Sequence, residues 1–299
     1  MTNAPASPKI GSPHHLLSVD VDDLLIANAE FYGESTAPGY VSDLEREVAA
    51  GLALLHECGV QATFFVNGQY CERHPDLLKE ITAGGHVLAS HGFRHWSVKT
   101  LSLHEFEVDL CRSLEHLSRL QGSVIGYRPP AFSMPYDDEH LRILSRNGIR
   151  YVSSGVGVAR SNAPRSEVPV AVSQGLLHVP ISTAHFLGGR MKYPIGYGVT
   201  ARLMPERVYL FTLRRWLRTK PFFHLYCHSF ELGGLSKTFT IPYWRLPARL
   251  STTIYSSRCR NRHRYLASIF RTVHFRSIEA SLFDNPHTRP TIPQLEDRQ

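Results

Sequence analysis

The 299-residue chain has few cysteines, and those it has are not paired along the sequence. The cysteines are Cys58, Cys71, Cys111, Cys227 and Cys259, an odd number, and no two of them form a Cys-x-x-Cys motif. A disulfide-rich secreted scaffold and a structural zinc site built on Cys-x-x-Cys pairs are therefore not expected. The pattern is typical of a protein from a reducing compartment.

Long apolar runs are also missing. No stretch approaches the roughly 18 to 20 apolar residues that a membrane-spanning helix needs. The first residues, MTNAPASPKIGSPHH, lack the apolar segment of a secretion signal. We therefore expect a cytoplasmic protein without a transmembrane segment. Its polar, proline-containing ends predict disorder over residues 1–13 and 285–299, which leaves a single domain over residues 14–284.

Acidic residues are in the minority, since 26 Asp and Glu face 33 Lys and Arg and the formal charge is +7. The basic residues gather at 202–220 and 258–271, where apolar residues recur at roughly helical spacing. This pattern predicts amphipathic helices with a solvated basic face. The alternative is peripheral contact with an anionic glycan, a nucleotide-linked sugar or a membrane surface. No nucleic-acid-binding motif accompanies the charge, so nucleic acid is not an expected partner, and the oligomeric state stays open.

Short apolar runs alternate with helical patterns through most of the chain. Strands are predicted at 15–20, 60–66, 86–90, 124–128, 149–154, 176–182 and 222–228, and helices at 42–59, 74–85, 102–122 and 137–148. Ser42 with Glu45, and Ser102 with Glu105, have the spacing of helix-capping boxes. This rhythm predicts an α/β fold with parallel strands, either a (β/α) barrel or an open doubly wound sheet. No GxGxxG or GxxxxGK[ST] motif follows any strand, so a dinucleotide or P-loop site is not supported.

Residues with metal-binding or proton-transfer chemistry follow four of these strands. Asp20, Asp22 and Asp23 follow the first, His91 and His95 the third, Arg128 the fourth, and His228 ends the last. In a barrel, the C-terminal ends of the strands form one face, where functional residues meet. Each residue alone has an ordinary interpretation, namely an acidic turn, a surface histidine pair, a loop ion pair or a core histidine. Their shared position at strand ends favours a common site.

The spacing of His91 and His95 suits one metal ion if the segment makes a helical turn. Two imidazoles and one carboxylate leave coordination positions open, which is the pattern of a catalytic metal site. Arg128, followed by two prolines, can hold a carboxylate in a fixed geometry. A partly buried His228 is suited to act as a general acid.

These stretches, in this order, resemble the polysaccharide deacetylases of the NodB-homology type, carbohydrate esterase family 4, over roughly residues 14–230. SVDVDD at 18–23 is similar to the first motif of that family. HGFRH at 91–95 resembles its H-[ST]-x-x-H motif, and RPPA at 128–131 its R-x-P-[YF] motif. LYCH at 225–228 resembles its final histidine strand. ATFFVNG, ERHP, YRPPAFS and CHSFEL are similar to the branch with DVED-type first motifs, which is associated with exopolysaccharide biosynthesis.

The resemblance implies a distorted (β/α) barrel of the NodB type as a single domain, with core motifs at 14–230 and a basic extension at 231–284. It also implies a hydrolase of non-peptide carbon–nitrogen bonds that removes acetyl groups from an N-acetylated amino sugar. Carried over by position, Asp22, His91 and His95 would bind a divalent metal, with Asp23 as the alternative to Asp22. Zinc is the first expectation, and cobalt, nickel or manganese are the alternatives.

The catalytic roles carry over in the same way. Asp20 would be the general base, Arg128 would orient it, and His228 would protonate the leaving amine. The loop of Pro130, Ala131 and Phe132 would contact the substrate, with the Ala131 backbone N–H at the oxyanion.

Three residues depart from the family pattern: Gly92 replaces Ser or Thr, Ala131 replaces an aromatic residue, and Val152 replaces an Asp expected to position the arginine. Two alternatives therefore remain, a hydrolase of a cyclic amide or imide and a catalytically inactive barrel that binds glycan. A cytoplasmic enzyme would meet nucleotide-linked or lipid-linked precursors before a finished glycan.

Overall fold

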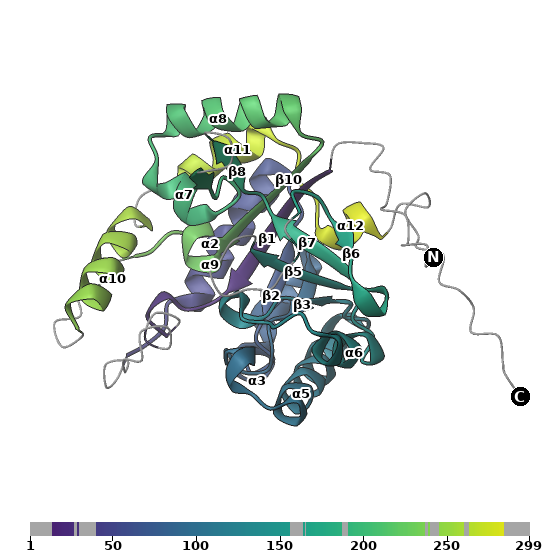
Figure 1. Cartoon of the computed structure of the whole chain (residues 1–299). Helices are drawn as coiled ribbons and strands as arrows, with labels where there is room; N and C mark the ends of the chain where they lie inside the picture. The colour runs from purple at the N-terminus through teal and green to yellow at the C-terminus, as the bar shows by residue number, and fades with distance from the viewer. Residues whose placement is uncertain are drawn as a thin grey trace, which may run out of the picture.

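The computed structural model describes residues 14–26, 29, 40–155, 164, 166–186, 191–236, 239, 245–259 and 263–283. The two predicted disordered ends, 1–13 and 285–299, lie outside these residues. In Figure 1 a curved sheet occupies the centre, and helices cover its outer side. None of the described helices is both long and apolar enough to cross a bilayer.

The main sheet has eight strands in the order β10-β1-β2-β3-β4-β5-β7-β6. Its neighbouring pairs are parallel except β6–β7, which is antiparallel. The strands are β1 (His14–Val21), β2 (Thr63–Val66), β3 (Val87–Ser90), β4 (Gly126–Tyr127), β5 (Tyr151–Gly155), β6 (Val170–Ala171), β7 (Leu177–Ile181) and β10 (Phe222–His228). All seven predicted strands are confirmed, although most are shorter than predicted. The short edge strand β6 and the two-stranded ribbon of β8 (Ala184–Phe186) and β9 (Met191–Tyr193) were not predicted.

Irregular backbone joins the two sides of the sheet after β7. The Ser182 N–H donates to the His224 carbonyl on β10 at 3.3 Å, and the Gly196 N–H donates to the Ser182 carbonyl at 2.8 Å. The Tyr226 N–H in turn donates to the Gly196 carbonyl at 2.7 Å. The sheet is thus curled into an incomplete barrel, and the predicted distorted (β/α) barrel is confirmed. An open, doubly wound sheet is excluded.

The four predicted helices are confirmed as α2, α4, α5 and α6. The helices among the described residues are α2 (Leu44–Cys58), α3 (Tyr70–Arg73), α4 (Pro75–Ala83), α5 (Leu103–Gln121), α6 (Asp138–Arg146), α7 (Gly198–Leu203), α8 (Glu206–Thr219), α9 (Ser229–Leu232), α10 (Leu246–Cys259), α11 (His263–Thr272) and α12 (Ile278–Leu282). Helix α8 buries Tyr209, Leu213 and Trp216, while its arginines are exposed. The prediction of a solvated basic face is therefore confirmed for α8, whereas Arg202, which begins the same basic run, is buried in α7.

One predicted capping box forms and the other does not. The Ser102 hydroxyl accepts from the Glu105 N–H at 3.3 Å, and the Glu105 carboxylate accepts from the Ser102 N–H at 2.8 Å. The prediction for Ser42 and Glu45 is wrong. The helix begins one residue later than the box requires, with Asp43 at its N-cap. The Ser42 hydroxyl donates to Asp23 and accepts from the Leu44 N–H at 3.2 Å, while Glu45 pairs with His74, so the reciprocal hydrogen bonds of a capping box do not form.

Candidate metal and catalytic site

Strands β1 and β10 lie side by side in register and form the floor of the site. Asp20 is opposite His228, and Ser18 is opposite Tyr226. Because side chains alternate between the two faces of a strand, Ser18 and Asp20 point to the same side. Asp22 follows at the end of β1, and both aspartates are buried. The floor therefore presents two carboxylates beside a histidine.

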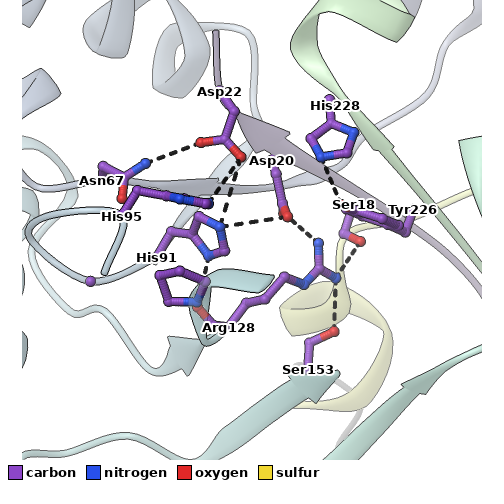
Figure 2. A network of polar contacts seen from close by, with 12 residues as sticks. Ser18, Asp20, Asp22, Asn67, His91, His95, Arg128, Ser153, Tyr226 and His228 are labelled. Atoms are coloured by element: carbon purple, nitrogen blue, oxygen red, sulfur yellow. Dashed lines mark hydrogen bonds and ion pairs between the residues drawn. The ribbon is translucent and has the colours of Figure 1, made fainter. Parts of the chain in front are cut away.

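Three donor atoms converge above this floor. The Nε2 atoms of His91 and His95 lie 3.8 and 3.7 Å from Oδ2 of Asp22. The Asn67 side chain donates to the other oxygen of Asp22 at 3.1 Å, so Oδ2 is the one that faces the histidines. Figure 2 shows the three side chains pointing toward one another. The structure thus brings together Asp22, His91 and His95, as the resemblance implies, within the reach of one metal ion.

His91 is held in the tautomer that a metal ligand needs. Its Nδ1–H donates to the Arg128 carbonyl at 2.7 Å, so the lone pair is on Nε2, which faces Asp22. Burial lowers the pKa of His91 to about 3, although the nearby carboxylate of Asp22 acts in the opposite direction. A neutral imidazole fixed through its second nitrogen is the usual arrangement of a metal-binding histidine. The donor set therefore fits a divalent cation.

The two histidines converge through a loop and not through the helical turn considered from the sequence. Gly92 has a φ of +79°, and a Cβ placed there would lie 2.8 Å from Oδ2 of Asp109. Asp109 accepts from the N–H groups of Phe93 and Arg94 at 2.8 and 3.1 Å. Gly92 departs from the family pattern for a physical reason. A side chain at this position would collide with the Asp109 carboxylate, which holds the loop in shape.

Arg128 is completely buried and is hydrogen-bonded to three side chains. It donates to Asp20 at 2.5 Å and to the hydroxyls of Ser18 and Ser153 at 2.7 and 2.8 Å. Val152, the residue that departs from the family pattern, packs into the apolar core instead. Because successive strand residues face opposite ways, it is the next residue, Ser153, that reaches the arginine. Ser18 and Ser153 therefore hold Arg128 in place together with Asp20.

A chain of neutral hydrogen-bonding groups extends from Arg128 through Ser18 and His224 to Pro180 on β7. The Ser18 hydroxyl, which accepts from Arg128, lies 2.7 Å from Nε2 of His224. The His224 Nδ1–H donates to the Pro180 carbonyl at 3.0 Å, so Nε2 accepts from Ser18. Burial, followed by the charge of Arg128, lowers the pKa of His224 to about 3. Asp20 is therefore the only carboxylate that the described contacts give to the guanidinium.

His228 is bonded at both ring nitrogens. Its Nδ1 lies 3.1 Å from the buried carboxylate of Glu231, and its Nε2 shares a hydrogen bond of 2.8 Å with the Tyr226 hydroxyl. Burial alone would lower the pKa of His228, but the hydrogen bond and charge of Glu231, together with Asp20 and Asp22, raise it. The histidine is thus disposed to carry a proton beside the carboxylates of the floor.

Asp23 lies apart from this cluster. One of its oxygens accepts from the N–H groups of Leu25 and Ile26, and the other accepts from the hydroxyls of Tyr40 and Ser42. Both oxygens are therefore occupied in fixing the chain after β1, and the geometry favours Asp22 over Asp23 as a ligand.

The loop after Arg128 makes an unusual turn at the site. Ala131 and Phe132 both have a left-handed backbone, with φ of 49° and 53°. Such conformations are disfavoured for residues with a side chain and tend to occur at functional sites. Pro130 is buried, Ala131 is exposed, and the Phe132 ring packs edge-on against Tyr197 and Tyr226. The turn leaves the small Ala131 at the surface, between rigid neighbours.

Several residues of the site were missed from the sequence. They are Ser18, Asn67, Ser153, His224, Tyr226 and Glu231. The period of two along β1 and β10 was the available signal for Ser18, His224 and Tyr226, since these share a face with Asp20 and His228. Glu231 stands three residues after His228, where a short helix brings it back to the histidine.

The chain matches the polysaccharide deacetylase family model over residues 39–152. That segment carries His91, His95 and Arg128, and it does not include the strands of Asp20 and His228. A peptidoglycan-N-acetylglucosamine deacetylase of Bacillus cereus is 31% identical over 84 residues, which are 28% of this chain and 29% of that protein. A chitin deacetylase of Colletotrichum lindemuthianum is 30% identical over 90 residues, which are 28% of this chain and 35% of that protein.

These matches span about a third of the length of the curated relatives. A crystal structure from Mycobacterium smegmatis, described as that of a polysaccharide deacetylase candidate, superposes with a TM-score of 0.55. It is 20% identical, and the match covers 90% of this chain and 88% of that one. This likeness shows the fold. The family model and the names of the relatives support a polysaccharide deacetylase domain.

Proposed function

We propose that the protein is a metal-dependent hydrolase that removes the acetyl group from an N-acetylated amino sugar. The observation that supports this proposal best is that one site holds a possible metal-ligand set, a candidate general base and a candidate general acid. Asp22, His91 and His95 form a ligand set with Asp20 beside it, and His228 lies opposite Asp20. The matched relatives are named for deacetylation of peptidoglycan N-acetylglucosamine and of chitin.

Asp22, His91 and His95 would hold the divalent metal, with zinc as the first candidate and cobalt, nickel or manganese as alternatives. When bound, such a cation supplies Lewis-acid polarisation of the amide carbonyl and lowers the pKa of a water molecule. Asp23 is not proposed as a ligand, because its oxygens are used elsewhere.

The proton chemistry would belong to the residues of the floor. Asp20 would take the proton of the attacking water, and Arg128 would fix the direction of its carboxylate through their hydrogen bond. His228, charged with the help of Glu231, would give a proton to the nitrogen as the carbon–nitrogen bond breaks. The proton given would be the one on Nε2, which shares a hydrogen bond with the Tyr226 hydroxyl when no substrate is bound.

The substrate would lie against the turn after Arg128. The N–H of the exposed Ala131 would contribute to oxyanion stabilisation, where negative charge develops in the transition state. Pro130 and Phe132 would form a rigid wall for the sugar. The similarity to the DVED-type branch favours a substrate from exopolysaccharide biosynthesis, carried on a glycan, a nucleotide or a lipid.

The test is acetate release from a panel of free, nucleotide-linked and polymeric N-acetylated sugars, with cyclic imides included. The metal-loaded wild-type protein should release acetate from at least one sugar. Asp20→Asn should lower kcat by about 10²- to 10⁴-fold, the usual effect of losing a general base, with the metal content unchanged.

The matched control is Asp76→Asn, which removes an exposed carboxylate from α4. It should leave both acetate release and metal content as in the wild type. Acetate release that survives Asp20→Asn would exclude the proposed base. Cleavage of an imide without any acetate release would favour the other hydrolase class.

A further inference from the structure

Helix α10 has its apolar and polar faces reversed. The described residues that it buries are small or polar: Ala248, Thr252, Ser256 and Cys259. Its large apolar side chains point outward, since Leu246, Leu250 and Ile254 are 56%, 50% and 56% exposed. These three residues are spaced by four, so they form one stripe along the helix.

This reversal is not the general behaviour of helices in this protein. The basic helix α8 exposes Val208 and Phe211, but it also buries three large side chains, Tyr209, Leu213 and Trp216, as an ordinary surface helix does. A stripe of large apolar side chains in water is unfavourable, and contiguous exposed apolar surface typically marks a binding site. We therefore expect the exposed apolar stripe of α10 to be covered by a binding partner.

The charge around the stripe indicates the nature of that partner. Arg258 is exposed and Arg249 is half-buried on the same helix. Residues 232–278, which include α10, contain nine Lys and Arg residues and no Asp or Glu. An exposed apolar stripe on a helix whose own charged residues, Arg249 and Arg258, are both basic suits attachment to the headgroup region of an anionic bilayer.

The stripe is small for a protein partner. A stable protein–protein interface uses about 20 to 30 residues on each side, whereas three large apolar side chains are exposed here. A bilayer surface needs no matching shape, and it combines shallow apolar insertion with attraction of the arginines.

We propose that α10 docks this protein on an anionic membrane surface, with Leu246, Leu250 and Ile254 inserted between lipid headgroups. The position of α10 links this surface to the site. Its buried Ala248 and Cys259 belong to one apolar cluster with Leu24, Leu25 and Phe230. Leu24 and Leu25 follow Asp22 in sequence, and Phe230 follows His228, so α10 packs against the segments that leave the site. Figure 1 shows the helix at one edge of the molecule, close to α7 and α9.

Resting on the proposed function, the substrate is then an N-acetylated sugar presented at the membrane on a lipid carrier. Docking through α10 would bring the site to the level at which such a sugar leaves the bilayer. A soluble oligosaccharide would be hydrolysed without any contribution from α10.

The test of docking is co-sedimentation of the full chain with vesicles of phosphatidylcholine alone or mixed with phosphatidylglycerol. Binding should require the anionic lipid and should weaken as salt is raised. Replacing Leu250 and Ile254 together by serine should lower binding about tenfold or more. Replacing Arg249 and Arg258 by glutamine should lower it by a similar factor. The matched control is Val108→Ser, which removes an equally exposed apolar side chain from α5 and should not change binding.

Two results would overturn docking: equal or absent binding to both kinds of vesicle, or a dimer in sedimentation velocity that Leu250→Ser with Ile254→Ser dissociates. The substrate class is tested by acetate release from a lipid-anchored N-acetylated sugar in vesicles and from a soluble oligosaccharide. The double serine variant should lose about tenfold on the first and nothing on the second. Vesicle binding by a protein that releases no acetate from any substrate would refute the proposed function and leave docking intact.

Discussion

Two pairs of histidines in this protein have the same spacing and opposite arrangements. His91 and His95 form one His-x-x-x-His sequence, and His224 and His228 form the other. The first pair lies in a loop, where the ring centroids are 5.2 Å apart. The second pair lies along β10, where four residues of strand span about 13 Å. Identical spacing therefore gives two converging imidazoles in one place and two separated ones in the other.

The histidines of these pairs also differ in protonation. Burial lowers the pKa of His91 and of His224 to about 3, which suits a metal ligand and a neutral hydrogen-bonding group. On the same strand as His224, the pKa of His228 is raised because Glu231 outweighs the effect of burial. The local backbone decides whether two histidines meet, and the partner at the second nitrogen decides what each can do.

The largest effect is expected from breaking the loop pair. His91→Ala removes one of three proposed ligands and leaves the other two, so metal affinity should fall by more than the 10- to 100-fold typical of losing a supporting residue. Acetate release should fall with it. Metal content after gel filtration and acetate release at saturating metal are the measurements.

His56→Ala is the matched control, since it removes an exposed histidine from α2. It should keep both metal content and acetate release. If His91→Ala retained the metal with wild-type affinity, the assignment of Asp22, His91 and His95 as the ligand set would be wrong.

Much of this arrangement could be predicted from the sequence, because it rests on continuous apolar runs and on unusual residues that follow them. The strands and the positions of Asp20, Asp22, His91, Arg128 and His228 at their ends are of this kind. The fold followed from the alternation of these runs with helical patterns.

The missed residues look ordinary in sequence. Asn67 and Glu231 matter only because a loop and a short helix return them to Asp22 and His228. The predicted box of Ser42 and Glu45 does not form because His74, a residue from another segment, binds the Glu45 carboxylate. Long-range competition of this kind leaves no periodic signal.

An intermediate effect on metal affinity is expected from Gly92→Ala. This variant tests whether the loop conformation at Gly92 brings His91 and His95 together. Alanine at a left-handed position costs about 1–2 kcal/mol, and here its Cβ would also meet Asp109 at 2.8 Å. Gly59→Ala is matched, because Gly59 has a φ of +63° and nothing lies within 4 Å of its Cβ position. Both variants should unfold at lower urea concentration. Only Gly92→Ala should also weaken metal binding, by about tenfold, as isothermal titration would show. Equal metal affinity in the two variants would contradict the role given to the loop.

The smallest effect is expected from His224, in the strand pair. It concerns how the free energy of unfolding depends on pH. The pKa of His224 is about 3 in the folded protein and 6.5 for a free side chain. The unfolded chain therefore binds more protons below pH 6.5, and stability is lost as the pH falls from there toward 3. Between pH 7 and pH 4.5 this histidine should account for about 2 kcal/mol of the loss. His224→Gln keeps a group that can accept from Ser18 and donate to Pro180, but it does not titrate. Urea unfolding at both pH values should show a smaller loss for the variant than for the wild type, whereas parallel losses would mean that His224 is protonated in the folded protein.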